Sequence, residues 1–178
     1  MATALQNQKF SVLFDRFDAD QNGKIDQTDI DLIVQGWCTT FEIAPGTPKW
    51  RTMVGHANKL WQDLLGHADT DGDKEVSREE WVNSMDKPEF LEDVLIPFAL
   101  ATYELADTDG DGRVSREEMD RAQQHSGMSP EDRAQSFAVL DIDGDGYVTK
   151  EEFTTAARDF FLSTDANAPG NLLAGKLG

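Results

Sequence analysis

Four twelve-residue stretches of one pattern decide how this chain folds: DADQNGKIDQTD (18–29), DTDGDKEVSREE (69–80), DTDGDGRVSREE (107–118) and DIDGDGYVTKEE (141–152). We name them loops 1 to 4 and number the positions within each from 1 to 12. Every loop has Asp at positions 1 and 3, Asp or Asn at position 5, Ile or Val at position 8 and an acid at position 12. A repeat of this kind indicates one structural unit used four times.

The spacing of these acids suits a hard divalent cation. Calcium takes six to eight oxygen ligands, and side chains at positions 1, 3 and 5 converge on one point when such a loop coils around it. Position 7 adds its backbone carbonyl and position 12 a bidentate carboxylate, while Gly at position 6 permits a turn with positive φ. The four stretches therefore resemble the EF-hand calcium loop.

The predicted metal ligands are the residues at positions 1, 3, 5, 7 and 12. In loops 1 and 2 they are Asp18, Asp20, Asn22, Lys24 and Asp29, and Asp69, Asp71, Asp73, Glu75 and Glu80. In loops 3 and 4 they are Asp107, Asp109, Asp111, Arg113 and Glu118, and Asp141, Asp143, Asp145, Tyr147 and Glu152. We expect three to four calcium ions, with magnesium as the alternative in the first loop.

The loops differ at positions that affect ion binding. Loops 3 and 4 match at every ligand position, with Ser115 and Thr149 at position 9 acting through water or a hydroxyl. Loop 2 has Lys74 at position 6, where a side chain at positive φ costs about 1–2 kcal/mol and weakens binding. Loop 1 ends in Asp29, which is one methylene shorter than Glu and predicts a weaker or mixed calcium/magnesium site. Asp26 at its position 9 recovers part of the charge.

Apolar residues with helical spacing flank the loops, which indicates amphipathic helices. Around loop 1 they are Phe10, Leu13, Phe14 and Phe17 before it, and Ile30, Ile33, Val34 and Trp37 after it. Ser129 and Pro130 read as the cap and first residue of the helix that enters loop 4. The sequence predicts an all-α fold with four EF-hands in two pairs packed into one compact globule. Short β-bridges at position 8 would join the paired loops.

The composition limits which partners and which cellular environment we expect for the chain. The 178 residues carry a net charge of −18, which disfavours binding to nucleic acid and to anionic membranes. No stretch is apolar and long enough to span a membrane, and no signal peptide is visible. We expect a cytoplasmic monomer with no evident protein partner. The single cysteine, Cys38, excludes an intramolecular disulfide and is expected to be a buried structural thiol.

The layout of the chain resembles a known family. A long insertion, roughly 41–61, lies between loops 1 and 2, and the chain ends in RDFFLSTDANAPGNLLAGKLG (158–178). With four hands in 178 residues, it is similar to the sarcoplasmic calcium-binding proteins, and most to their bacterial, calerythrin-like branch. The resemblance implies two hand pairs packed face to face and a calcium buffer or modulator without enzymatic activity. In that family one hand has often lost its ligands, whereas all four keep acids here.

Domain limits follow from the same layout. We predict an N-terminal pair of hands over 1–88, a C-terminal pair over 89–163 and a tail, 164–178, that packs on the body. The apolar stretch 90–98 is expected to be buried between the halves. Leu172 and Leu173 of the tail are expected to plug a groove in cis.

Three classes of function compete. A calcium buffer is the leading hypothesis. The alternative is a calmodulin-like sensor that regulates a protein partner, although sensors expose Met-rich grooves and this chain has only five Met. A luciferin-binding protein or photoprotein would group His, Tyr and Trp around a pocket, whereas His56, His67 and His125 are scattered. No nucleophile–His–acid arrangement is evident, so we expect no enzyme.

Overall fold

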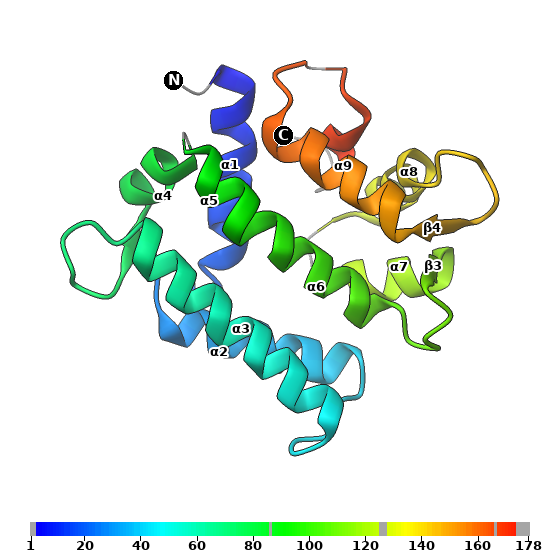
Figure 1. The fold of residues 1–178 in the computed structure, drawn as a ribbon, viewed down its shortest axis with the longest axis horizontal. Helices are drawn as coiled ribbons and strands as arrows, with labels where there is room; N and C mark the ends of the chain where they lie inside the picture. Colours follow the sequence, from blue (N-terminus) through cyan, green and yellow to red (C-terminus); the bar gives the residue numbers. More distant parts are fainter. Residues whose placement is uncertain (1–2, 86, 125–127, 166, 174–178) are drawn as a thin grey trace. The chain divides into compact units, whose positions relative to one another are not determined.

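The computed structural model of the chain describes residues 3–85, 87–124, 128–165 and 167–173, and each of the four loops joins two helices (Figure 1). It divides into two compact units, residues 1–98 and 99–178, each with two loops. His125 and the last part of the predicted tail lie outside the described residues. Among the helices described, none is both long and apolar enough to cross a membrane.

Unit 1 holds loops 1 and 2 and the helices around them. Its elements are α1 (Ala4–Phe17), β1 (Lys24–Ile25), α2 (Gln27–Thr40), α3 (Pro48–His67), β2 (Val76–Ser77), α4 (Arg78–Met85), α5 (Pro88–Phe90), η1 (Leu91–Leu95) and the start of α6 (Ile96–Ala106). The insertion between loops 1 and 2 is mostly helix. Thr47 caps α3 by accepting a hydrogen bond from the Trp50 amide, and Pro48 is its first residue.

Aromatic side chains from three helices form the core of unit 1. Trp81 of α4 is fully buried, and its Nε1 donates to the Phe10 carbonyl at 2.9 Å. The rings of Phe14, Phe17 and Phe90 surround it with centroid distances of 5.3–6.2 Å. The bonded indole N–H satisfies the one polar group that this ring would otherwise bury unpaired.

A π-helical turn, η1, precedes α6. Pro97 in α6 has no N–H to donate, and its ring would crowd the carbonyl four residues earlier in a regular helix. The Ile96 amide bonds instead to the Leu91 carbonyl, five residues back, which widens the helix at this point. The apolar residues of this turn are buried, whereas Pro97 is exposed and Phe98 is partly exposed. That the stretch 90–98 lies between the halves stays a prediction.

Unit 2 holds loops 3 and 4. Its elements are the rest of α6, β3 (Arg113–Ser115), α7 (Arg116–Gln123), α8 (Pro130–Leu140), β4 (Tyr147–Thr149), α9 (Lys150–Leu162) and the 3₁₀-helix η2 (Pro169–Leu172). Ser129 caps α8 by accepting from the Asp132 amide, as predicted. One cluster forms the core: Tyr103, Ala106, Val114, Met119, Phe137, Leu140, Val148, Phe153 and Ala156.

Paired loops are joined by short antiparallel bridges at position 8. Ile25 pairs with Val76 in unit 1, and Val114 pairs with Val148 in unit 2, with all four side chains buried. The predicted all-α fold with four hands and bridges between paired loops is confirmed. The predicted domain limits and the packing of one pair against the other stay predictions.

Two expectations about individual helix faces need correction. Cys38 is half-buried rather than buried, because it lines an open groove between α2 and α3. The α2 stripe is also less buried than its periodicity suggests: Ile30 is buried, whereas Ile33, Val34 and Trp37 remain partly exposed. A helix at the edge of a small unit covers the core with only part of its apolar face.

Candidate metal centres

Each loop gathers three acids around one point. Their carboxylate oxygens lie within 4.8 Å of one another. The four groups are Asp18, Asp20 and Asp29; Asp69, Asp71 and Asp73; Asp107, Asp109 and Glu118; and Asp141, Asp143 and Glu152. Each group belongs to one twelve-residue loop, and all of its members are predicted ligands. The predicted ligands Glu80, Asp111 and Asp145 are not members of these groups.

Hydrogen bonds to the backbone of the loop hold these side chains in place. The carboxylate at position 1 accepts from the amide at position 6 at 2.9–3.1 Å in all four loops. The side chain at position 5 accepts from the amide at position 7 at 2.8–3.0 Å. These local bonds turn the ligand side chains inward, and a bound cation would find them already oriented.

The closing Glu at position 12 links both ends of its loop. In loop 3 one oxygen of Glu118 accepts from the Thr108 amide (2.9 Å) and hydroxyl (2.6 Å), and the other from the Ser115 amide and hydroxyl (both 2.9 Å). Ser115 in return caps α7 by accepting from the Glu118 amide, which completes a capping box. The same reciprocal pattern joins Ser77 to Glu80 and Thr149 to Glu152.

These bonds favour the charged form of the closing carboxylates. Backbone hydrogen bonds from Thr70 and Ser77 lower the pKa of Glu80 to about 2. Burial acts to raise the pKa of Glu118, but the hydrogen bonds from Thr108 and Ser115 outweigh the effect of burial and lower the pKa to about 2. Three loops thus present an ionised closing carboxylate over the whole neutral range, because Glu152 is shifted in the same direction.

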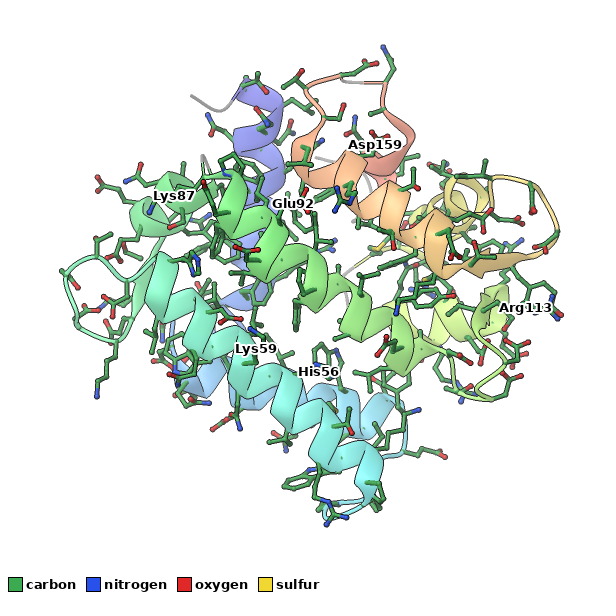
Figure 2. All side chains as sticks on the ribbon, in the orientation of Figure 1. His56, Lys59, Lys87, Glu92, Arg113 and Asp159 are labelled. Carbon is green, nitrogen blue, oxygen red and sulfur yellow. The ribbon has the colours of Figure 1, made fainter. Side chains whose placement is uncertain are left out.

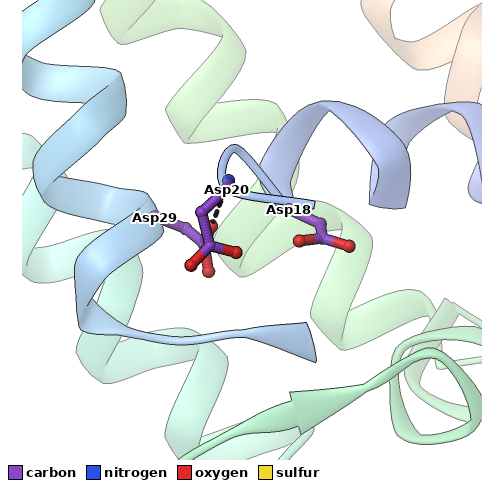
Figure 3. Close-up of side chains that lie close together, drawn as sticks. All are labelled: Asp18, Asp20 and Asp29. Atoms are coloured by element: carbon purple, nitrogen blue, oxygen red, sulfur yellow. Dashed lines mark hydrogen bonds between the residues drawn. The ribbon is translucent and has the colours of Figure 1, made fainter. Parts of the chain in front are cut away.

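Loop 1 closes differently (Figure 3). Asp29 is fully buried and accepts from the Asp20 amide at 3.1 Å and the Asp26 amide at 2.8 Å. In loops 2 to 4 the position-12 carboxylate accepts its hydrogen bond from the start of the loop from the amide at position 2. In loop 1 the shorter Asp29 accepts it from the amide at position 3 instead. Burial raises the pKa of Asp29 against these two bonds, the opposite direction from the closing Glu residues. Asp26, expected to add charge at the ion, accepts from the Thr28 amide at 2.6 Å and caps α2.

Two ligand oxygens are buried without a hydrogen-bond donor in the part of the chain that the structure describes. They are Oδ1 of Asp18 and Oδ1 of Asp141, the position-1 acids of loops 1 and 4. A buried carboxylate oxygen is costly to leave unsatisfied, and a cation at the centre of the loop satisfies it. The oxygen-only donor set therefore fits calcium, the hard ion that such loops bind.

The loops of the two units differ in backbone strain. Lys74 has φ +64° at position 6, as predicted, and Gln21 has φ +61° at position 4 of loop 1, which the sequence analysis missed. Loops 3 and 4 have glycines at both positions, with φ between +73° and +88°. A non-glycine residue in this region costs about 1–2 kcal/mol, so each loop of unit 1 carries strain that unit 2 avoids.

Side chains at position 7 link paired loops, although their carbonyls alone were expected to matter. In unit 1 Lys24 forms an ion pair with Glu75. In unit 2 the Arg113 guanidinium stacks on the ring of Tyr147, 3.7 Å from its centroid. Diagonal neighbours across an antiparallel pair are within reach of long side chains, and the strand register makes these residues such neighbours.

Tyr103 of α6 is a further link that sequence reasoning missed. Its buried hydroxyl lies 2.9 Å from the Val148 carbonyl in loop 4 and 3.3 Å from the Gly112 carbonyl in loop 3, and it can donate to either. Burial raises the pKa of Tyr103 to about 12, so the phenol stays protonated and remains a donor.

Comparison with known proteins agrees with this geometry. Two family models described as an EF-hand domain pair match residues 99–158 and 1–30. The solved structure of a Streptomyces coelicolor calcium-binding protein is 35% identical, with a TM-score of 0.74 over 88% of this chain and 97% of that one. The chain belongs to the EF-hand calcium-binding proteins. A search of curated proteins found no match to this EF-hand sequence.

More distant structures share the fold of this EF-hand protein. A sarcoplasmic calcium-binding protein from amphioxus is 21% identical, with a TM-score of 0.79 over 99% of this chain and all of that one. A coelenterazine-binding protein from Renilla muelleri is 24% identical, with a TM-score of 0.66 over 98% and 99%. The predicted resemblance to sarcoplasmic calcium-binding proteins and to a bacterial branch is confirmed.

Proposed function

We propose that this EF-hand protein is a calcium buffer that takes up three to four ions without opening an apolar surface to a partner. The proposed ligands are the side chains at positions 1, 3, 5 and 12 and the carbonyl at position 7 of each loop. We expect the loops of unit 2 to bind calcium most tightly, since both of their left-handed positions are glycine.

The observation that carries the buffer proposal is the docked tail. Helix η2 packs against α8 and α9 (Figure 1), and Leu173 packs against the core cluster of unit 2. Asn171 is 7% exposed, and its side-chain amide donates to the Asp165 carbonyl at 3.0 Å. A segment of the same chain thus covers apolar surface of unit 2, which supports a molecule that stays closed to a partner.

Gly170 lets the tail lie close to α9. A Cβ at this position would meet the Ala156 carbonyl oxygen at 2.5 Å and Cβ of Asp159 at 2.6 Å. Asp159, labelled in Figure 2, lies on α9 at this contact, with an oxygen 3.5 Å from the Gly170 amide. A larger residue at position 170 would therefore push the tail away from the helix.

A calcium sensor is the second candidate, and one comparison favours it. The Streptomyces coelicolor protein, 35% identical, is described as a calcium-binding protein in prokaryotic calcium-mediated regulation. If this chain shares that role, calcium must expose apolar surface for a target, as EF-hand sensors do.

A calcium titration that follows ion uptake by calorimetry and apolar exposure by the fluorescence of a hydrophobic dye tests the proposal. A buffer takes up three to four ions with little change in dye fluorescence. Gly170→Val is the positive control, because displacing the tail should raise dye binding with or without calcium. Gly66→Val is its matched control at an exposed helical glycine with no atom within 4 Å of an added Cβ.

The two candidates give opposite results in the wild-type chain. A calcium-dependent rise in dye fluorescence that approaches the level of Gly170→Val would refute the buffer proposal in favour of a sensor. Absence of any calcium uptake would refute both.

A further inference from the structure

The position-7 side chains of loops 3 and 4 form a contact that the ligand scheme does not require. The register of β3 and β4 pairs Arg113 with Thr149 and Ser115 with Tyr147, which places Arg113 and Tyr147 diagonally on one face. The guanidinium carbon lies 3.7 Å from the centre of the Tyr147 ring. At this distance the ring face attracts the cation and holds it at the edge of the bridge, where Figure 2 labels Arg113.

The same guanidinium is bonded to a proposed calcium ligand. Nε of Arg113 donates to Oδ2 of Asp111 at 3.0 Å, and the Arg113 backbone amide donates to Oδ1 at 3.0 Å. Tyr147 of loop 4 thus holds a positive charge against the position-5 carboxylate of loop 3.

The backbone bond is sufficient to orient a position-5 carboxylate. Asp73 in loop 2 accepts from the Glu75 amide at 2.8 Å, and Asp145 in loop 4 accepts from the Tyr147 amide at 2.8 Å. Removing the Arg113 side chain would leave Asp111 with the equivalent bond. What the guanidinium adds to loop 3 is therefore mainly charge.

We propose that Arg113 is a resident cation that lowers the affinity of loop 3 for calcium, and that Tyr147 is the residue that keeps it in place. The inference rests on the proposed function, because it presupposes that loops 3 and 4 take up calcium. An ion that used Asp111 as a ligand would share this carboxylate with the guanidinium. Like charges at such close range repel even in a water-like dielectric, and we expect an effect of roughly three- to tenfold in affinity.

The two loops of unit 2 are then unequal although their ligand sets are alike. Among the described residues no guanidinium is hydrogen-bonded to the position-5 carboxylate of loop 4, and the charge of Arg113 acts less on Asp145 than on Asp111. Loop 4 should therefore fill first. Loop 3 should fill at a higher calcium concentration, which widens the range over which unit 2 takes up the ion.

A site-resolved titration of the full chain separates the loops. The Gly112 and Gly146 amides each donate to the position-1 carboxylate of their own loop at 3.0 Å, so their NMR signals report loops 3 and 4 separately. With free calcium set by a chelator buffer, Arg113→Gln should raise the affinity at Gly112 by roughly three- to tenfold, and that at Gly146 by clearly less, because Asp145 feels the charge of Arg113 without a hydrogen bond to it. High salt should shrink the gain.

Matched variants test the role of each partner. Arg116→Gln removes the same charge from an exposed position of the same loop and should change the Gly112 midpoint by less than about twofold. Tyr147→Leu should produce most of the gain in calcium affinity seen with Arg113→Gln, because the guanidinium no longer has an aromatic ring to pack on. Tyr147→Phe keeps the ring and should behave like the wild type.

The outcomes are distinct. If neither glycine amide responds to calcium in the wild type, the proposed function fails. If both respond but Arg113→Gln matches Arg116→Gln or lowers the affinity of loop 3, the inference is overturned. If Arg113→Gln raises that affinity and Tyr147→Leu does not, the role of Tyr147 is overturned.

Discussion

Glu118→Gln tests the hydrogen-bonded closure of loop 3 without calcium. The carboxylate accepts four hydrogen bonds, two on each oxygen. An amide keeps one acceptor oxygen and turns its NH₂ group toward the donors of either Thr108 or Ser115. The lowering of the Glu118 pKa from its ordinary value of 4.5 to about 2 corresponds to roughly 3 kcal/mol of preference for the charged form. Partial exposure reduces this, and we expect a loss of about 2 kcal/mol in chelator.

Urea unfolding followed by circular dichroism in chelator measures the loss. Glu117→Gln is the matched control, since it removes the same charge from an adjacent, exposed position of the first turn. The sign with pH follows from the shift. Because the folded pKa lies below the unfolded one, the stabilisation is complete above about pH 4.5 and fades as pH falls toward 2. Equal stability of the two variants at pH 7 would refute the described closure of the loop.

Four further outcomes are expected. Millimolar calcium should raise the midpoint of thermal unfolding by more than about 10 °C over chelator, measured by calorimetry, because only the folded loops bind the ion. Lys74→Gly should stabilise the chain by about 1 kcal/mol in denaturant unfolding and raise the affinity of loop 2, since the φ of +64° is then unstrained. Tyr103→Phe should lower stability by about 1–2 kcal/mol, because the Val148 carbonyl loses a buried donor; an unchanged unfolding midpoint would contradict this. Asp29→Glu should raise calcium affinity at loop 1 and weaken competition by magnesium in paired titrations, at a cost of about 1 kcal/mol in chelator, because the added methylene enters a fully buried site. Equal magnesium sensitivity of wild type and variant would show that Asp29 does not set the ion preference.

The parts of the site that local spacing determines were predictable. The acids at positions 1 and 3, the bridges at position 8 and the Ser129 cap each depend on a few neighbouring residues whose geometry is nearly the same in every such loop. Lys74 at positive φ was predictable for the same reason, because its position in the loop requires that backbone conformation.

The parts that depend on packing were not predictable. Asp29 was predicted as a ligand one methylene shorter than Glu, but the spacing did not indicate that it is fully buried. The contact of Arg113 with Tyr147 depends on strand register and side-chain rotamers, which periodicity does not contain. The Tyr103 hydroxyl reaches carbonyls of two loops because of how its helix packs, and the residue pattern of α6 does not predict this contact.

The capping boxes at positions 9 and 12 have a consequence for how such loops lose function over evolution. The residue that closes the proposed ion site also begins the following helix, so replacing Glu118 or Glu152 weakens two structures at once. The acids at positions 3 and 5 serve the ion and bonds within their own loop, such as the bond from Arg113 to Asp111, but they do not begin a helix. In a hand that has lost calcium binding, the acids at positions 3 and 5 should therefore be replaced first. Ser or Thr at position 9 and Glu at position 12 should persist, because they still cap the following helix.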